Sequence, residues 1–216
     1  YQETPTWYQA SVGDAYKAYT LGTTPAKMKA YVQVCDDSEG PSRAGSDGVR
    51  FCKRYPNETA TSGVYKPVGE LQNRAEAVRV SAFGYALENG TGRYGGVLRA
   101  PMKFLGPQYR DAADVLQSNG QAEWDATTGI FTTDPLNAAA GSTAFPAGAP
   151  TFSTSGVVNY LNNFGSTGIY KSNDPVGELY YEALRYFQGL QPTDAAVANL
   201  TTTMYDGFPI YKTWTD

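Results

Sequence analysis

The stretch from residue 173 to residue 190 constrains the fold most, because its apolar residues recur at helical spacing. They fall at i, i+3, i+4, i+7, i+8 and i+11, namely Val176, Leu179, Tyr180, Ala183, Leu184 and Phe187. Asp174 stands at the N-cap position, Pro175 at the first helical position and Gly189 just past the stripe. The pattern predicts an amphipathic helix that buries this stripe, so that Leu184→Ala costs about 2–5 kcal/mol of stability. The opposite, solvated face is expected to hold Glu178, Glu182, Arg185 and Gln188.

Alternation, helical spacing and turn residues predict the other regular elements. In chain order these are a strand over 28–35, a returning strand over 49–54, a short helix over 67–77, a strand over 78–85, an edge strand over 96–105 and a helix over 155–165. Pro101 makes the strand over 96–105 an edge, because proline cannot donate to a ladder. Residues 106–152 are the least regular part, and their EWDATTGIF run predicts a turn with Trp124 and Ile130 buried.

This order of elements predicts an α/β or α+β fold class. We expect a single sheet with an antiparallel edge hairpin, packed by about three helices and joined by long ordered loops. The length of 216 residues is compatible with one domain spanning 1–216. Within it we expect an irregular N-terminal arm over 1–27, a core over 28–190 and a polar C-terminal tail over 191–216. The abrupt ends of the sequence predict a fragment or mature piece of a longer protein.

The charge and the missing histidine exclude several classes of function. A net charge of -4, with lysine and arginine scattered along the chain, argues against a nucleic-acid-binding surface. No apolar run approaches the roughly 20 residues needed to cross a bilayer. The sequence contains no histidine, so neither a Ser-His-Asp nor a Cys-His mechanism is available within this chain. We therefore expect a protein that is not an enzyme.

Cys35 and Cys52 are the two cysteines, and they enclose a polar loop flanked by strand-like runs. A disulfide between them would constrain the unfolded chain by roughly 3 kcal/mol and would imply an oxidising compartment. The alternative is two reduced thiols in a cytosolic core. Long Gly/Ser loops rarely keep buried cysteines at both ends, and we therefore favour the disulfide.

Two sets of acidic residues could carry chemistry. Asp36, Asp37 and Ser38 follow the 28–35 strand, and their oxygens suit a hard cation such as Ca²⁺ or Mg²⁺. The other interpretation of this cluster is a solvated polar turn. Glu123 and Asp125 have the residue types of a glycosidase pair, but two acids at this spacing are routine in proteins.

Aromatic side chains in the expected loops form a second kind of candidate site. With 17 tyrosines, 23 glycines and 13 prolines, the chain suggests long loops held in place by rings. Such rings can stack on sugars or anchor a protein partner, or they can simply pin the loops to the core. The candidate ligand-binding residues are Trp7, Tyr8, Tyr94, Tyr109 and Trp124.

Seven runs of the sequence together resemble the PilC/PilY-type tip proteins of bacterial type IV pili. In chain order they are VQVCDDSEG, YKPVGELQNRAEAVRVSAFGYALENG, GGVLRAPMKFLGP, AEWDATTGIF, SGVVNYLNNFG, YKSNDPVGELYYEALRYF and DGFPIYKTW. They cover roughly residues 28–214, and residues 1–27 carry little of the resemblance.

The resemblance implies a segment from the N-terminal half of a large exported protein, with a β-propeller downstream. It also implies a von Willebrand factor A (vWA)-like fold, here in a partial or modified form. Asp36, Asp37 and Ser38 match the first three positions of the vWA metal motif, whereas Gly40 stands where its last serine belongs.

The function implied is that of a non-enzymatic domain of an extracellular adhesin at the pilus tip on the bacterial surface. It would act in surface or host attachment, twitching motility and pilus biogenesis. The implied partners are a host-cell or abiotic surface receptor, minor pilins and the remainder of the same polypeptide. The alternative is a lectin-like, carbohydrate-binding module that uses the loop tryptophans and tyrosines.

Overall fold

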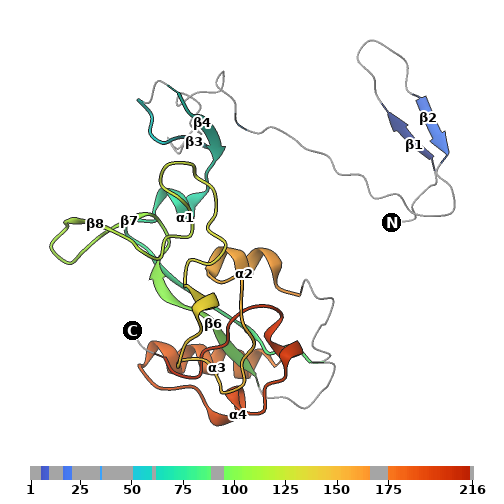
Figure 1. Ribbon diagram of the computed structural model, residues 1–216, viewed down its shortest axis with the longest axis vertical. Coiled ribbons are helices and arrows are strands. Elements are labelled where there is room, and N and C mark those ends of the chain that lie inside the picture. Colours follow the sequence, from blue (N-terminus) through green and yellow to red (C-terminus); the bar gives the residue numbers. More distant parts are fainter. Residues whose placement is uncertain are drawn as a thin grey trace. The chain divides into compact units, whose positions relative to one another are not determined.

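The computed structural model describes residues 6–9, 17–20, 35, 51–59, 62–88, 95–165 and 175–214 (Figure 1). It has two compact units, residues 1–34 and residues 35–216, and each is described here by itself. In the first unit, β1 (Thr6–Gln9) pairs antiparallel with β2 (Lys17–Thr20). The expected irregular arm over 1–27 therefore contains a hairpin, and the single domain over 1–216 stays a prediction.

The second unit is built around one long hairpin. β5 (Arg79–Tyr85) pairs antiparallel with β6 (Gly96–Phe104), as the alternation and the glycine turns predict. Residues 96–100 of β6 are all buried, so both faces of this strand are covered. Gly84 of β5 has no side chain where the ring of Tyr160 packs, and a Cβ at this position would collide with the Tyr160 hydroxyl. This contact places the helix that carries Tyr160 directly on the hairpin.

Two shorter hairpins complete the second unit. β3 (Cys52–Tyr55) pairs with β4 (Val64–Pro67), and β7 (Gln108–Arg110) pairs with β8 (Leu116–Ser118). The α+β class is confirmed, but the described strands form four separate two-stranded sheets rather than one. Each strand finds its partner across a local turn, and every described pair is antiparallel. The open sheet of a vWA domain is not found among the described residues.

The described residues of the second unit form four α-helices: α1 (Glu70–Asn73), α2 (Val157–Asn163), α3 (Val176–Phe187) and α4 (Asp194–Val197). Two 3₁₀ turns, Ala138–Ala140 and Thr202–Tyr205, lie in the loops. α1 is shorter than the helix expected over 67–77, because Val64–Pro67 is used as a strand. α2 and α3 pack against the β5/β6 hairpin, and α4 contacts β6 (Figure 1).

The face that α3 buries differs from the predicted one. Glu182 and Tyr186 are its buried residues, whereas Leu184 of the expected stripe is 39% exposed. The Glu182 carboxylate accepts hydrogen bonds from the Thr193 amide (3.2 Å) and hydroxyl (2.5 Å). The Tyr186 hydroxyl accepts one from the amide of Met102 at 2.8 Å. These polar contacts fix which face of α3 is buried. The spacing of apolar residues alone does not predict them.

Two clusters of buried side chains form the core. The larger one joins β5 and β6 to α3, α4 and the C-terminal segment, and the smaller one holds Trp124, Val157 and Tyr160. Residues expected to form a polar tail over 191–216 supply much of the larger cluster: Ala196, Met204, Tyr205, Ile210, Tyr211 and Trp214. The burial of Trp124 is confirmed, and that of Ile130 is wrong because this side chain is 60% exposed.

Candidate functional site

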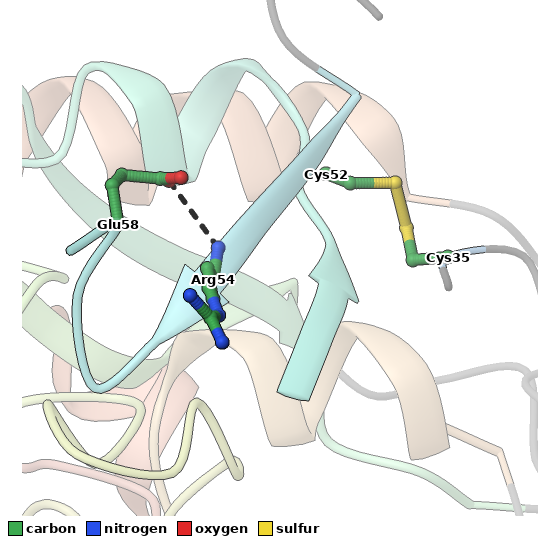
Figure 2. Close-up of a disulfide and its surroundings, with 4 residues drawn as sticks. All are labelled: Cys35, Cys52, Arg54 and Glu58. Carbon is green, nitrogen blue, oxygen red and sulfur yellow. Dashed lines mark hydrogen bonds between the residues drawn. A yellow bond between two sulfur atoms is a disulfide. The ribbon is translucent and has the colours of Figure 1, made fainter. Parts of the chain in front are cut away.

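The predicted disulfide is present in the structure. Cys35 and Cys52 are bonded through their sulfur atoms, with a Cα–Cα distance of 6.0 Å and a sequence separation of 17 (Figure 2). Cys52 begins β3, and two residues later the Arg54 amide donates a hydrogen bond of 3.3 Å to Glu58 Oε1. Because Cys52 is the first residue of β3, the disulfide joins Cys35 to the β3/β4 hairpin.

The proposed cation ligands Asp36, Asp37 and Ser38 lie outside the described residues, so the Ca²⁺ or Mg²⁺ site stays a prediction. Among the described residues, no group of three or more histidine, cysteine, aspartate or glutamate side chains is placed to hold a metal ion. Nor does any helix in the described ranges have the length and apolar character that crossing a membrane requires.

The structure describes the side chains of two of the five candidate aromatic residues, Tyr109 and Trp124. Trp7 and Tyr8 lie in β1 opposite Tyr19 and Ala18, their side chains are outside the description, and Tyr94 lies outside the described residues. Tyr109 in β7 is half-buried and stacks on Phe104, with 4.6 Å between the ring centroids. Trp124 is 5% exposed and sits in the core. Its ring therefore pins a loop, and ligand binding by the other four stays a prediction.

The carboxylates of Glu123 and Asp125 both accept hydrogen bonds from backbone amides. Glu123 is fully buried, lies 2.6 Å from Lys103 Nζ and accepts from the amides of Val157 and Val158. Burial lowers the pKa of Lys103, and the charge of Glu123 opposes that shift. Asp125 accepts from the amides of residues 127 and 128 and so shapes the turn that follows Trp124. These contacts give both acids structural partners.

Arg99 joins the β5/β6 hairpin to the C-terminal segment. It is 1% exposed, and its guanidinium lies 5.5 Å from the centre of the Tyr160 ring. It donates hydrogen bonds to four backbone carbonyls, those of Tyr85 (2.5 Å), Met204 (3.0 Å), Tyr205 (2.7 Å) and Phe208 (3.3 Å). Burial lowers the pKa of Arg99, and the charges of Tyr160 and Asp206 oppose this shift. The signal in the sequence was a lone cation inside the apolar run GVLRAPM, which we did not interpret.

Residues 136–145, in the loop before α2, form one wall of a surface hollow of about 440 Å³. β6, residue 121 and the C-terminal segment supply the other walls. The lining residues are Pro101, Met102, Gln121, Leu136, Asn137, Gly141, Ser142, Ala144, Phe145, Tyr211 and Thr213. A second hollow of about 290 Å³ adjoins it and shares Gly141, Ser142 and Phe145. No charged residue lines either hollow.

Specific contacts hold the segment around this hollow in place. The Asp134 carboxylate accepts hydrogen bonds from the amides of Ala138 (2.8 Å) and Ala139 (2.9 Å) and from the Ser155 hydroxyl. Burial would raise the pKa of Asp134, but these hydrogen bonds lower it below its usual value. The Phe145 ring packs edge-on against Tyr211, and the Ala144 carbonyl accepts from the Lys212 amide at 2.8 Å. A segment without regular structure is therefore ordered by an acid, a ring and the C-terminal backbone.

The exposed side of α3 presents an apolar surface. Val176, Tyr180 and Phe187 are each more than half exposed on it, with Phe187 the most exposed at 68%. An exposed apolar stripe of this kind is a common feature of surfaces that contact another protein.

Comparison with known proteins gives the chain its context. It is 36% identical over 198 residues to the type IV pilus biogenesis factor PilY1 homolog of Xylella fastidiosa strain Temecula1. The chain resembles part of a type IV pilus biogenesis factor. The match covers 88% of this chain and 15% of that relative, so the chain spans a small part of the relative's length. No protein-family model matches the chain, and no solved structure matches it.

Proposed function

We propose that the chain is a non-enzymatic segment of an extracellular type IV pilus protein that acts in pilus biogenesis and in attachment of the pilus tip. The similarity to the Xylella pilus biogenesis factor carries this proposal, because it extends over 88% of the chain. Its partners are the remainder of a longer polypeptide, minor pilins and a receptor on a host-cell or abiotic surface.

Two features of the chain support an exported protein without catalytic activity. The disulfide between Cys35 and Cys52 is of the kind that persists in oxidising compartments such as the periplasm and the cell surface. The sequence contains no histidine, and the acidic residues Glu123 and Asp125 are engaged in structural hydrogen bonds. The expected activity is binding and assembly.

A segment exchange in a bacterium that carries the relative tests this proposal. One strain lacks the matching segment of its pilus biogenesis factor, and a second strain carries this chain in its place. We expect the deletion to abolish attachment and twitching, and the exchange to restore them. A deletion strain that twitches and attaches like the parent would contradict the proposal, provided that the shortened protein is exported at the parental level.

A further inference from the structure

The hollow of about 440 Å³ has the size and lining of a small-molecule site. Sites for small molecules typically occupy roughly 300–1,000 Å³, so this hollow lies at the lower end of that range. Five of its lining side chains carry neutral hydrogen-bonding groups: Gln121, Asn137, Ser142, Tyr211 and Thr213. We propose that the hollow binds a neutral saccharide.

The lining contains no charged side chain, and this disfavours an ionic ligand. None of the eleven lining residues is acidic or basic. Asp134 is the acid whose charge acts on Tyr211, but it lies outside the lining, and its carboxylate already accepts three hydrogen bonds. A phosphate, carboxylate or ammonium group in the hollow would lose its hydration and gain no opposite charge. The ligand is therefore uncharged.

The hydrogen-bonding groups of the lining are available to a ligand. Within the described part of the chain, the side chains of Gln121, Asn137, Tyr211 and Thr213 make no hydrogen bond to protein, whereas Ser142 Oγ accepts one from the Ala144 amide. A hydroxyl-rich ligand satisfies such groups, because each sugar hydroxyl both donates and accepts. An apolar peptide side chain would bury them without a partner, which is costly.

The lining also contains apolar side chains on which a sugar ring can pack. Phe145 and Tyr211 are aromatic lining residues, and Met102 and Leu136 add aliphatic surface. A pyranose has C–H faces that pack on such surfaces, while its hydroxyls point toward the polar rim. The walls are already ordered, because Phe145 contacts both Phe152 and Tyr211 at ring-centroid distances of 5.4 and 5.1 Å. A preformed site of this kind loses little entropy on binding.

This inference names the ligand class for the attachment role of the proposed function, and its biological meaning rests on that role. The site differs from the loop tryptophans and tyrosines considered from the sequence. Binding is measured on the purified chain alone, so a negative result there leaves the test of pilus biogenesis unaffected. If the chain bound a saccharide but failed the segment exchange, the pilus role would be contradicted and the saccharide binding would not.

Saturation-transfer NMR of the purified 216-residue chain tests the proposal. The panel consists of neutral mono- and disaccharides at millimolar concentration, with sialic acid and glucuronic acid as charged probes and a proline-rich peptide as a non-sugar probe. We expect signals from at least one neutral saccharide and none from the charged sugars. The proposal is overturned by silence across the neutral panel, or by signals from the peptide or the charged sugars alone.

Matched variants tie the signal to this hollow. Gln121→Ala with Thr213→Val removes two free polar groups, and affinity should fall about 5- to 150-fold, since each lost hydrogen bond is worth about 0.5–1.5 kcal/mol. Gln188→Ala with Thr127→Val makes the same chemical changes at exposed positions outside the hollow and should leave affinity unchanged. Asn137→Gly deletes a third amide while keeping the left-handed backbone at φ 53°. Equal affinity in both double variants would overturn the site.

Discussion

Arg99 ties the hairpin to the C-terminal segment through hydrogen bonds to the carbonyls of Met204, Tyr205 and Phe208, and it also donates to the Tyr85 carbonyl of β5. Arg99→Met fills much of the same volume but removes a hydrogen-bond donor from four carbonyls, of which those of Met204 and Tyr205 keep the amides of Leu87 and Phe208. We expect the free energy of unfolding to fall by about 3–5 kcal/mol, as measured by urea denaturation, because each hydrogen bond from a charged donor contributes about 1.5–3 kcal/mol. Arg74→Met is the control, because Arg74 is exposed and pairs only with Glu70 one turn away, a contact worth about 0.3–0.5 kcal/mol. A loss at Arg99 below about 1 kcal/mol would contradict this role.

Asp134 links the acid stability of the second unit to the wall of the hollow. Its folded pKa lies below the usual value of 3.8, because hydrogen bonds from Ser155, Ala139 and Ala138 outweigh its burial. A depressed pKa contributes stability that is present above the unfolded value and is lost as the pH falls through the folded pKa. Asp134→Asn should therefore lower stability near pH 6 and flatten its decline below pH 4. Denaturation curves between pH 2 and pH 7 check this, and an unchanged acid decline in the variant would contradict it.

The helix α3 illustrates what the spacing of apolar residues in a sequence can and cannot predict about a single element. Its existence could be predicted, and its bounds to within about one residue, because apolar spacing and proline are local signals; Pro175, expected at the first helical position, is the N-cap. Its buried face could not, because Glu182 and Tyr186 find their partners in Thr193 and Met102, which are distant in sequence. A buried carboxylate on a helix is recognisable only when the hydroxyl that satisfies it is known.

Two truncations in α3 distinguish the observed face from the predicted one. Tyr186→Ala removes a ring that is 3% exposed and packs on Phe83 and Trp214, so it should cost about 3–5 kcal/mol. Leu184→Ala, on the exposed side, should cost less than about 1 kcal/mol. Chemical denaturation of both variants gives the comparison. If Leu184→Ala proved the more destabilising of the two, the orientation of α3 would be wrong.

At the scale of the whole molecule, one hairpin and the disulfide were the parts that the sequence could predict, whereas the β1/β2, β3/β4 and β7/β8 pairings were not predicted. The 78–105 hairpin follows from alternation and glycine turns, and the disulfide follows from two cysteines that flank a polar loop. The assembly of the core could not be predicted, because residues 204–214 look like an ordinary tail until Arg99 and Tyr186 are placed beside them. The hollow was missed for the same reason, since its walls come from segments far apart in the chain.

The disulfide is expected to stabilise the folded chain as a whole. Replacing both cysteines by serine opens a loop with a sequence separation of 17 and should cost about 3 kcal/mol. Thermal and urea denaturation of the double variant, next to the oxidised parent, measure this cost. Mass spectrometry of the purified parent should find no free thiol, and two free thiols would contradict both the disulfide and the exported location.

The central claim is that this chain does the work of a pilus biogenesis factor segment. The most direct measurement is the amount of pilin sheared from the surface of the deletion and exchange strains, relative to total cellular pilin. We expect almost no sheared pilin in the deletion strain and close to the parental amount when this chain replaces the segment. Parental amounts in the deletion strain, or none in an exchange strain that exports its protein normally, would contradict it.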